Sequence, residues 1–423
     1  MYKKTVLNNK LRVATHEMKG RDSVSVGIWI GAGGRYENTQ NKGAAHFLEH
    51  IVFKGTKKYP CYAIKELIEG VGGSLNAFTD EELTCYFAKI PAKHLERTFD
   101  ILTDMTLFPL VSSEDVEKER TVILEEIKMY RDLPQHFVME LLDQLMWPGH
   151  PLGMNLTGSL ETVGKMSADD LEEFRETHYA PGKIVVAACG CLKHKELVDL
   201  SQKKFKGIRN KECPSFLKAN NSQAESQVKF FFKDTEQMHL ALGAFGLRID
   251  HPDRHAFNLL NIVLGANMSS RLFNEIREKR GLAYSISSAI KSLKDTGILL
   301  VSAGVDNKKV TEAVEVILGE LRRMKQDNIT KDEFTRAKDY YLGQMLLGLE
   351  DTLEHMFWVG GQTLILNKTR KLDDILKEVK KVTIADIKRV ANVIFAEKNI
   401  NLAVVGPLND IQQKDLSDSI IRF

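Results

Sequence analysis

One short segment, Ala44–Phe53, sets the strongest condition on how this chain folds. Apolar residues flank its polar ones and it contains neither Pro nor Gly, which predicts a helix. At about 100° per residue, His46, Glu49 and His50 fall on one face of that helix. Two neutral imidazoles one turn apart can bind a tetrahedral zinc ion, and a carboxylate between them can accept a proton from water. A metal site on this face needs a third protein ligand from another element.

The same motif also has an ordinary interpretation. Patterns with three fixed positions recur by chance, and a histidine on an apolar helix face is usually a core residue. The motif alone therefore leaves both a metal site and a structural pair of histidines open.

The run Ser113–Tyr130 adds a second set of polar residues at buried positions. It begins with Ser and an acidic first turn, which is typical of a helix start. Glu119 and Glu126 occupy positions of the apolar stripe that otherwise consists of Val116, Ile123, Ile127 and Tyr130. A buried carboxylate is costly unless it is paired or bound to a metal. Glu125 is turned about 100° away. Salt bridges to basic neighbours are the alternative role for the two acids.

Five motifs in the first part of the chain match a known family. They are Gly-Arg-Tyr-Glu at 34–37, His-Phe-Leu-Glu-His at 46–50, Phe-Lys-Gly-Thr at 53–56, Gly-Gly-Ser-Leu-Asn-Ala-Phe-Thr at 72–79 and Glu-Arg-Thr-Val-Ile-Leu-Glu-Glu at 119–126. With them, the chain resembles the pitrilysin and insulinase family of metallopeptidases over nearly its whole length. Within that family it is most similar to the mitochondrial processing peptidase and its short bacterial relatives.

The resemblance implies a set of catalytic residues. His46, His50 and Glu126 would bind one Zn²⁺ per chain, and Glu49 would take a proton from the water that attacks the peptide carbonyl. Glu119 would orient one of the ligands without binding the metal itself.

The resemblance also implies substrate contacts in the first half. The strand expected at 74–79 corresponds to an edge strand that pairs with the substrate backbone, with Asn76 and Ala77 as contact residues. The alternative is that Asn76 and Thr79 only shape a hairpin.

A further substrate site is implied in the second half. The run Ser270–Tyr284 resembles the Arg and Tyr pair that binds substrate in the family, which maps to Arg277 and Tyr284. Such a pair can hold a peptide carbonyl and stabilise an oxyanion. Without the resemblance, the run reads as the basic end of a helix with a packed tyrosine.

The order of predicted elements indicates two similar halves. Residues 238–245 occupy the place of 23–30, residues 310–325 occupy the place of 92–107, and a polar segment without strands separates the halves. We expect an α+β fold with two similar domains, each a mostly antiparallel sheet packed with helices. The expected boundaries are a catalytic zinc domain at 1–212, a linker at 213–225, and a substrate-binding domain without metal ligands at 226–423.

Composition excludes several other classes of protein. Lys and Arg number 59 against 57 Asp and Glu, so charge gives no reason to expect nucleic acid or an anionic membrane as a partner. Five scattered cysteines argue against a disulfide framework, and the start of the chain lacks the apolar region of a signal peptide. We therefore expect a cytoplasmic location.

His16 stands alone on a predicted surface strand, and no role is expected for it.

Together with these features, the resemblance implies a zinc-dependent endopeptidase that hydrolyses unfolded peptides or extended segments held in a closed chamber. The resemblance implies a dimer, because this chain has two halves where the long members of the family have four. A homodimer is expected because one chain carries both the metal motif and the Arg277 and Tyr284 pair. The alternative is a non-catalytic structural or partner subunit, since such members of the family exist. A zinc hydrolase of another substrate class would explain neither the edge strand nor that pair.

Overall fold

The computed structural model describes residues 2–423, which form two compact units. Each unit is discontinuous along the chain. The first comprises Met1–Ile127, Asn155–Leu217 and Met345–Lys371, and the second comprises Lys128–Met154, Lys218–Gln344 and Leu372–Phe423. The segment 213–225, expected as a linker, contains one of the points where the chain passes from one unit to the other, between Leu217 and Lys218.

The first unit is built on a six-stranded sheet with the order β1-β2-β6-β3-β5-β4. The β2–β6 pair is parallel, and the other neighbouring pairs are antiparallel. The strands are β1 (Tyr2–Val6), β2 (Arg12–Glu17), β3 (Ser23–Ile30), β4 (Ser74–Thr79), β5 (Thr84–Pro91) and β6 (Ile184–Gly190). β4 therefore forms one edge of the sheet, as predicted for the segment 74–79.

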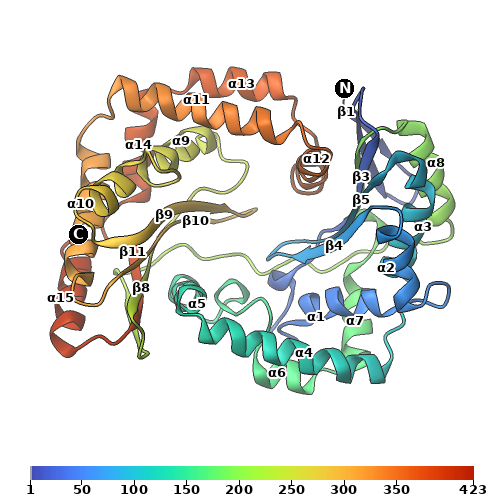
Figure 1. Cartoon of the computed structure of the whole chain (residues 1–423), viewed down its shortest axis with the longest axis horizontal. Coiled ribbons are helices and arrows are strands. Elements are labelled where there is room, and N and C mark those ends of the chain that lie inside the picture. The colour runs from blue at the N-terminus through green and yellow to red at the C-terminus, as the bar shows by residue number, and fades with distance from the viewer. Residues whose placement is uncertain (1) are drawn as a thin grey trace. The chain divides into compact units, whose positions relative to one another are not determined.

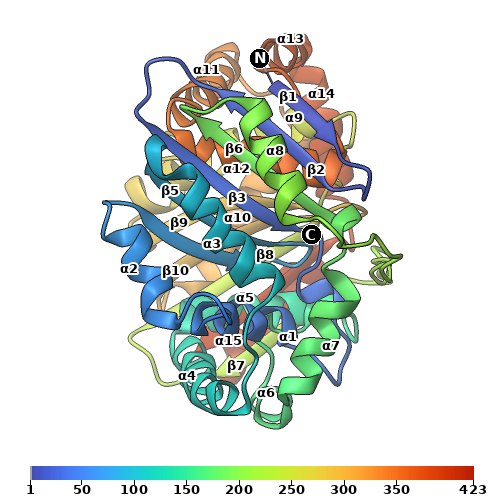
Figure 2. The same cartoon turned by 90° about the vertical axis from the view of Figure 1, so that its right-hand side faces the viewer.

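Helices cover one face of this sheet and enclose the larger core of the unit. Val24, Val26, Ile28 and Ile30 of β3 all point into this core because side chains alternate along a strand. Figure 2 shows α3 and α8 lying across the strands. The helices of this unit, apart from one on the opposite face, are α1 (Ala44–Ile51), α2 (Cys61–Glu69), α3 (Leu95–Leu107), α6 (Leu160–Lys165), α7 (Ala168–His178), α8 (His194–Lys204) and most of α4 (Ser113–Asp132).

The opposite face of the first sheet is covered by a helix from the last quarter of the chain, α12 (Thr352–Leu366) (Figure 1). Met356 and Val359 of α12 pack against Trp29 and the other side chains on this face. The Ser25 and Thr352 hydroxyls are 2.9 Å apart, and the Lys89 ammonium pairs with Asp351 at 2.5 Å. The second half of the chain thus completes the core of the first unit.

Two adjacent glycines of α12 differ in the space around them and provide a test of this packing. A Cβ at Gly360 would lie 2.1 Å from Nε1 of the buried Trp29, whereas a Cβ at Gly361 would lie 3.9 Å from that ring. We expect Gly360→Ala to lower the free energy of unfolding by roughly 1–3 kcal/mol, because overpacking outweighs the better helix propensity of Ala. Gly361→Ala should be neutral or stabilising by up to about 1 kcal/mol. Urea unfolding of both variants measures the difference, and equal effects would contradict this packing.

His16 is not the isolated surface residue that the sequence suggested. Its ring is half-buried and stacks on His355 of α12, with 4.3 Å between centroids, and the Tyr2 hydroxyl lies 3.0 Å from Nε2 of His355. Burial and the neighbouring His355 lower the pKa of His16 to about 4. The start of β1 and the end of β2 therefore contact α12 through aromatic and imidazole rings.

The second unit contains a five-stranded sheet with the order β7-β11-β8-β10-β9. The β7–β11 pair is parallel and the other neighbouring pairs are antiparallel. The strands are β7 (Val228–Phe232), β8 (Gln237–Phe245), β9 (Ala283–Ser292), β10 (Gly297–Asp306) and β11 (Ile400–Gly406). This order and these directions match β2-β6-β3-β5-β4 of the first unit strand for strand. The predicted α+β fold with two similar, mostly antiparallel domains is thereby confirmed.

Helices cover both faces of the second sheet as well. One face packs on helices that include α9 (Arg254–Leu264), α10 (Val310–Gln326), α14 (Ile384–Ile394) and α15 (Asp410–Ile421). The other face packs on α5 (Pro134–Met146), which comes from the first half of the chain (Figure 1). The remaining helices are α13 (Leu372–Lys381), a π-helix at Phe273–Glu278 and most of α11 (Lys331–Gly348), which passes into the first unit at Met345.

The two units therefore exchange helices: α5 belongs to the second unit and α12 to the first. The sequence boundaries 1–212 and 226–423 assign each of these helices to the other unit. Periodicity shows that a helix has an apolar face but does not identify the surface that it covers.

Within residues 2–423, no helix combines the length and the apolar composition that crossing a bilayer requires.

Candidate active site

The start of α1 is fixed by a buried carboxylate. Gly43 precedes the helix with a φ of 98°, a left-handed conformation that favours glycine. The Glu37 side chain accepts hydrogen bonds from the backbone N–H groups of Gly43 at 3.0 Å and Ala45 at 2.7 Å, and Lys42 pairs with it at 3.1 Å. Because these contacts satisfy the N-terminal N–H groups of the helix, they hold His46 in place one turn later.

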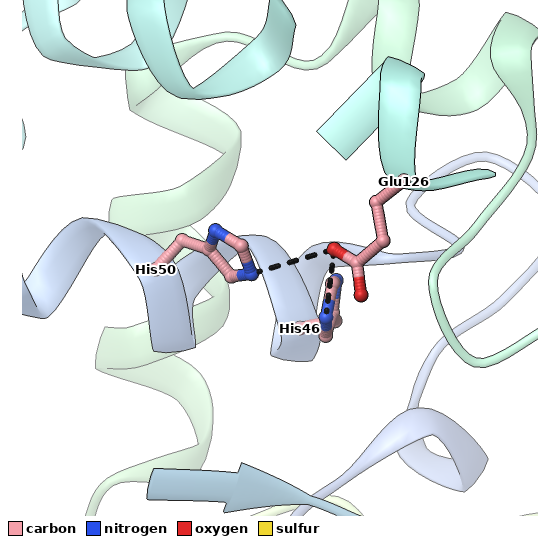
Figure 3. A group of neighbouring side chains, drawn as sticks. All are labelled: His46, His50 and Glu126. Atoms are coloured by element: carbon pink, nitrogen blue, oxygen red, sulfur yellow. Dashed lines mark ion pairs between the residues drawn. The ribbon is translucent and has the colours of Figure 1, made fainter. Parts of the chain in front are cut away.

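The structure brings the three predicted ligands together. His46 and His50 lie one turn apart on α1, and Glu126 approaches them from α4 (Figure 3). The Nε2 atoms of both histidines are 3.7 Å from Oε2 of Glu126, and the three ligand atoms lie within 4.8 Å of one another. Among residues 2–423 this is the one group of His, Cys, Asp and Glu side chains with metal-ligand geometry.

The chemistry of this donor set fits zinc. Tetrahedral ligands about 2.1 Å from a zinc ion lie roughly 3.4 Å apart, close to the observed 3.7 Å. Burial, with a smaller effect of His50, lowers the pKa of His46 to about 3, so this imidazole is neutral and able to bind a metal. The group combines two nitrogen donors with one carboxylate, a set that leaves a fourth position open at catalytic zinc sites.

Glu119 lies where its predicted role requires. Nδ1 of His50 donates a hydrogen bond to Oε2 of Glu119 at 3.1 Å, which leaves Nε2 of His50 with a free lone pair facing Glu126. The other oxygen of Glu119 pairs with Lys54, one turn beyond His50. Glu119 is 7% exposed, so the sequence inference of a buried acid on the apolar stripe agrees with the structure. By contrast, Nδ1 of His46 is buried without a hydrogen-bond partner among residues 2–423.

A residue of the first sheet forms a hydrogen bond with the Glu49 carboxylate. Its Oε2 accepts a hydrogen bond of 2.5 Å from the Thr79 hydroxyl, at the end of β4. Burial raises the pKa of Glu49, and the bond from Thr79 opposes that rise. A carboxylate whose pKa lies closer to neutrality is a better general base at physiological pH.

The edge strand β4 places Asn76 at an exposed position. The Asn76 side chain accepts a hydrogen bond of 2.8 Å from the N–H group of Ala77, the next residue. Because β4 is the edge strand of the sheet, its outer side is open to pairing with another strand. The substrate contacts at Asn76 and Ala77 remain predictions that this edge permits.

Arg277 and Tyr284 lie together in the second unit. Arg277 is on the π-helix and its guanidinium lies 5.5 Å from the Tyr284 ring centroid, at the start of β9. Tyr284 is 77% exposed, so it is not the packed tyrosine of the alternative interpretation. Arg277 also lines a cavity of about 450 Å³ together with Phe273, His239 and residues of α5. Their role in binding substrate stays a prediction.

Two contacts of the site were missed at the sequence level. Lys54 follows His46 and His50 at the same four-residue interval, which places the three side chains on one helix face. The contact of Lys54 with Glu119 could therefore have been predicted from the sequence. The contact of Thr79 with Glu49 joins a strand to a helix 30 residues apart, and no local pattern predicts it.

Comparison with known proteins identifies the family. Residues 12–159 match the family described as Insulinase (Peptidase family M16), and residues 165–341 match the Peptidase M16 inactive domain. An uncharacterized zinc protease of Bacillus subtilis is 34% identical over 96% of this chain and 98% of its own length. Another, from Streptomyces coelicolor, is 36% identical over 99% of this chain and 92% of its own length.

Solved structures share the fold. A protease from Helicobacter pylori superposes with a TM-score of 0.91 at 23% identity, covering 96% of this chain and 99% of that one. A peptidase M16 inactive domain from Pseudomonas fluorescens gives a TM-score of 0.89 at 16% identity, with coverage of 96% and 98%. The sequence motifs, the two similar sheets and these matches agree: the chain belongs to the insulinase family of peptidases.

Proposed function

We propose that this protein is a zinc-dependent endopeptidase whose site consists of His46, His50, Glu126 and Glu49. The observation that carries the proposal is the convergence of two imidazole nitrogens and one carboxylate oxygen, with His50 oriented by Glu119. A structural pair of core histidines would not require a third acidic group facing both Nε2 atoms. The names of the relatives, zinc proteases, support the same metal.

The residues divide the work of peptide hydrolysis. Zinc, when bound by His46, His50 and Glu126, would polarise the scissile carbonyl and lower the pKa of water. Glu49 accepts a proton from the attacking water, whose oxygen forms a bond to the carbonyl carbon. The same carboxyl then gives that proton to the amide nitrogen as the C–N bond breaks. Water is thus divided between the two products, and Glu49 returns to its starting state.

The proposed substrates are unfolded peptides or extended segments, because strand addition at β4 needs an exposed peptide backbone.

We propose that the protein acts as a homodimer, in keeping with a chain that carries the metal motif and also Arg277 and Tyr284. Light scattering on the purified protein should then give the mass of two chains.

The first test is zinc content together with cleavage of a quenched peptide library. We expect about one zinc per chain, loss of cleavage after chelation, and recovery on adding zinc back. A protein that binds zinc at this site yet cleaves no peptide would refute the peptidase proposal and favour the second candidate, a non-catalytic partner subunit.

The second candidate draws on the match of residues 165–341 to a domain described as inactive. That match does not include the residues of the proposed site, which lie between His46 and Glu126 and fall within the other match, 12–159. An inactive second domain is therefore compatible with an active first one.

The hydrogen bond between His50 and Glu119 leads to a prediction about zinc affinity. We expect Glu119→Gln to weaken zinc binding by about 10- to 100-fold, because the amide loses the charge that fixes the His50 ring and pairs with Lys54. Competition with a chromogenic chelator measures the affinity. Glu117→Gln is the control, since Glu117 is exposed on the same helix and pairs with Arg120. Equal affinities in the Glu119 variant and the wild type would refute the orienting role.

A further inference from the structure

We propose that Thr79 is a positioning residue that sets the orientation of Glu49 and thereby links the edge strand β4 to proton transfer. The inference rests on the proposed function, because it assigns Thr79 a task in the same reaction. It concerns a contact between two elements, the end of the strand β4 and the last turn of the helix α1.

The first step is that Glu49 depends on this contact. Among residues 2–423, the Thr79 hydroxyl is the one hydrogen-bond partner of the Glu49 carboxylate, at 2.5 Å from Oε2. Since a carboxylate only accepts, Thr79 donates, and the charge makes the bond stronger than one between neutral groups. The second oxygen of Glu49, Oε1, is left to receive a proton.

The second step is that the hydroxyl hydrogen of Thr79 is directed to Glu49. The nearest alternative acceptor is Thr84, its partner across β5, at 3.5 Å. The Thr84 hydroxyl in turn donates to the backbone oxygen of Ala32 at 3.1 Å. Because Thr is branched at Cβ, few side-chain rotamers are open to Thr79.

The third step is that the strand itself fixes Thr79. The preceding residue, Phe78, points to the opposite face and packs edge-on against Trp29 and Phe357, with centroids 5.8 and 5.7 Å away. These contacts anchor one face of the strand end. Along its outer edge, β4 has no neighbouring strand among the described strands of the sheet. A peptide that pairs with β4 would restrict the motion of this strand. Because Thr79 donates its hydrogen bond to Glu49, the orientation of Glu49 would then be restricted as well.

Two variants of Thr79 separate positioning from folding. Thr79→Val keeps the branched shape and removes the hydroxyl, whereas Thr79→Ser keeps the hydroxyl. We expect Thr79→Val to lower kcat by about 10- to 100-fold, the range of a hydrogen bond to a charged group. KM should change by less than about 3-fold, and zinc per chain and the melting temperature should stay at wild-type values. Thr79→Ser should restore most of the lost kcat.

Thr84→Val is the matched control, since it removes the neighbouring hydroxyl of the same hairpin without touching Glu49, and it should retain wild-type kcat. The inference is overturned if Thr79→Val cleaves as fast as the wild type, or if Thr79→Ser is as impaired as Thr79→Val. It is also overturned if Thr79→Val loses zinc or raises KM alone. A wild-type protein that binds zinc and cleaves nothing would instead overturn the proposed function, and this inference with it.

Discussion

Replacing Glu49 with glutamine is expected to lower kcat by about 10²- to 10⁴-fold, the range that a general base contributes. Glutamine has the size of glutamate and can still accept the hydrogen bond from Thr79, so the local structure should persist. Zinc content should equal that of the wild type, because Glu49 is not one of the three residues that converge on the metal position. The variant thus separates metal binding from proton transfer.

The measurement is turnover of the quenched peptide library beside zinc per chain, on wild type and variant prepared in the same way. Retained zinc with lost turnover supports Glu49 as the base. If Glu49→Gln cleaves at the wild-type rate, another group takes the proton and the mechanism proposed for this site is wrong.

The second large effect is expected at the metal ligands. Glu126→Gln should weaken zinc binding by more than about 100-fold, the upper end of the effect expected for residues that only hydrogen-bond a ligand. The reason is that, within residues 2–423, Glu126 supplies the one carboxylate oxygen that lies in metal-ligand geometry with the Nε2 atoms of His46 and His50. Cleavage should fall with the zinc content and recover in part at high zinc concentration.

The adjacent residue gives a closely matched control. Glu125 is exposed on α4, one residue before Glu126 and turned away from the cluster, so Glu125→Gln should keep both zinc and turnover. Zinc measured by elemental analysis after dialysis against a chelator compares the two. Loss of zinc in the Glu125 variant and its retention in the Glu126 variant would show that α4 presents the opposite face to α1.

Local periodicity was sufficient to place most residues of the candidate site on their helix faces, while their roles came from the family resemblance. The four-residue interval between His46 and His50 and the seven-residue interval between Glu119 and Glu126 each place two side chains on one helix face. The order of strands and helices likewise predicted the repetition of one sheet topology. These features depend on residues that are close in the sequence, so the spacing of side chains along a helix or strand is enough to predict them.

Contacts between distant segments could not be read in this way. The stacking of His16 on His355, the covering of each sheet by a helix from the other half, and the bond from Thr79 to Glu49 each join segments with no shared period. Hydrophobic patterning indicates that α12 buries apolar surface, but several sheet faces would satisfy it equally. Only the full chain determines which face is chosen.

The exchange of α5 and α12 has a consequence for how the protein is made. When a ribosome has synthesised the last strand of the first sheet, β6, the helix that covers Trp29, Phe87 and the rest of that face is still about 160 residues away. At roughly 5–20 residues per second, this apolar face waits for about 10–30 s before α12 emerges. We infer that the nascent chain is a client for chaperones during this interval, and that cutting the gene between the halves yields two fragments that each need the other in order to fold.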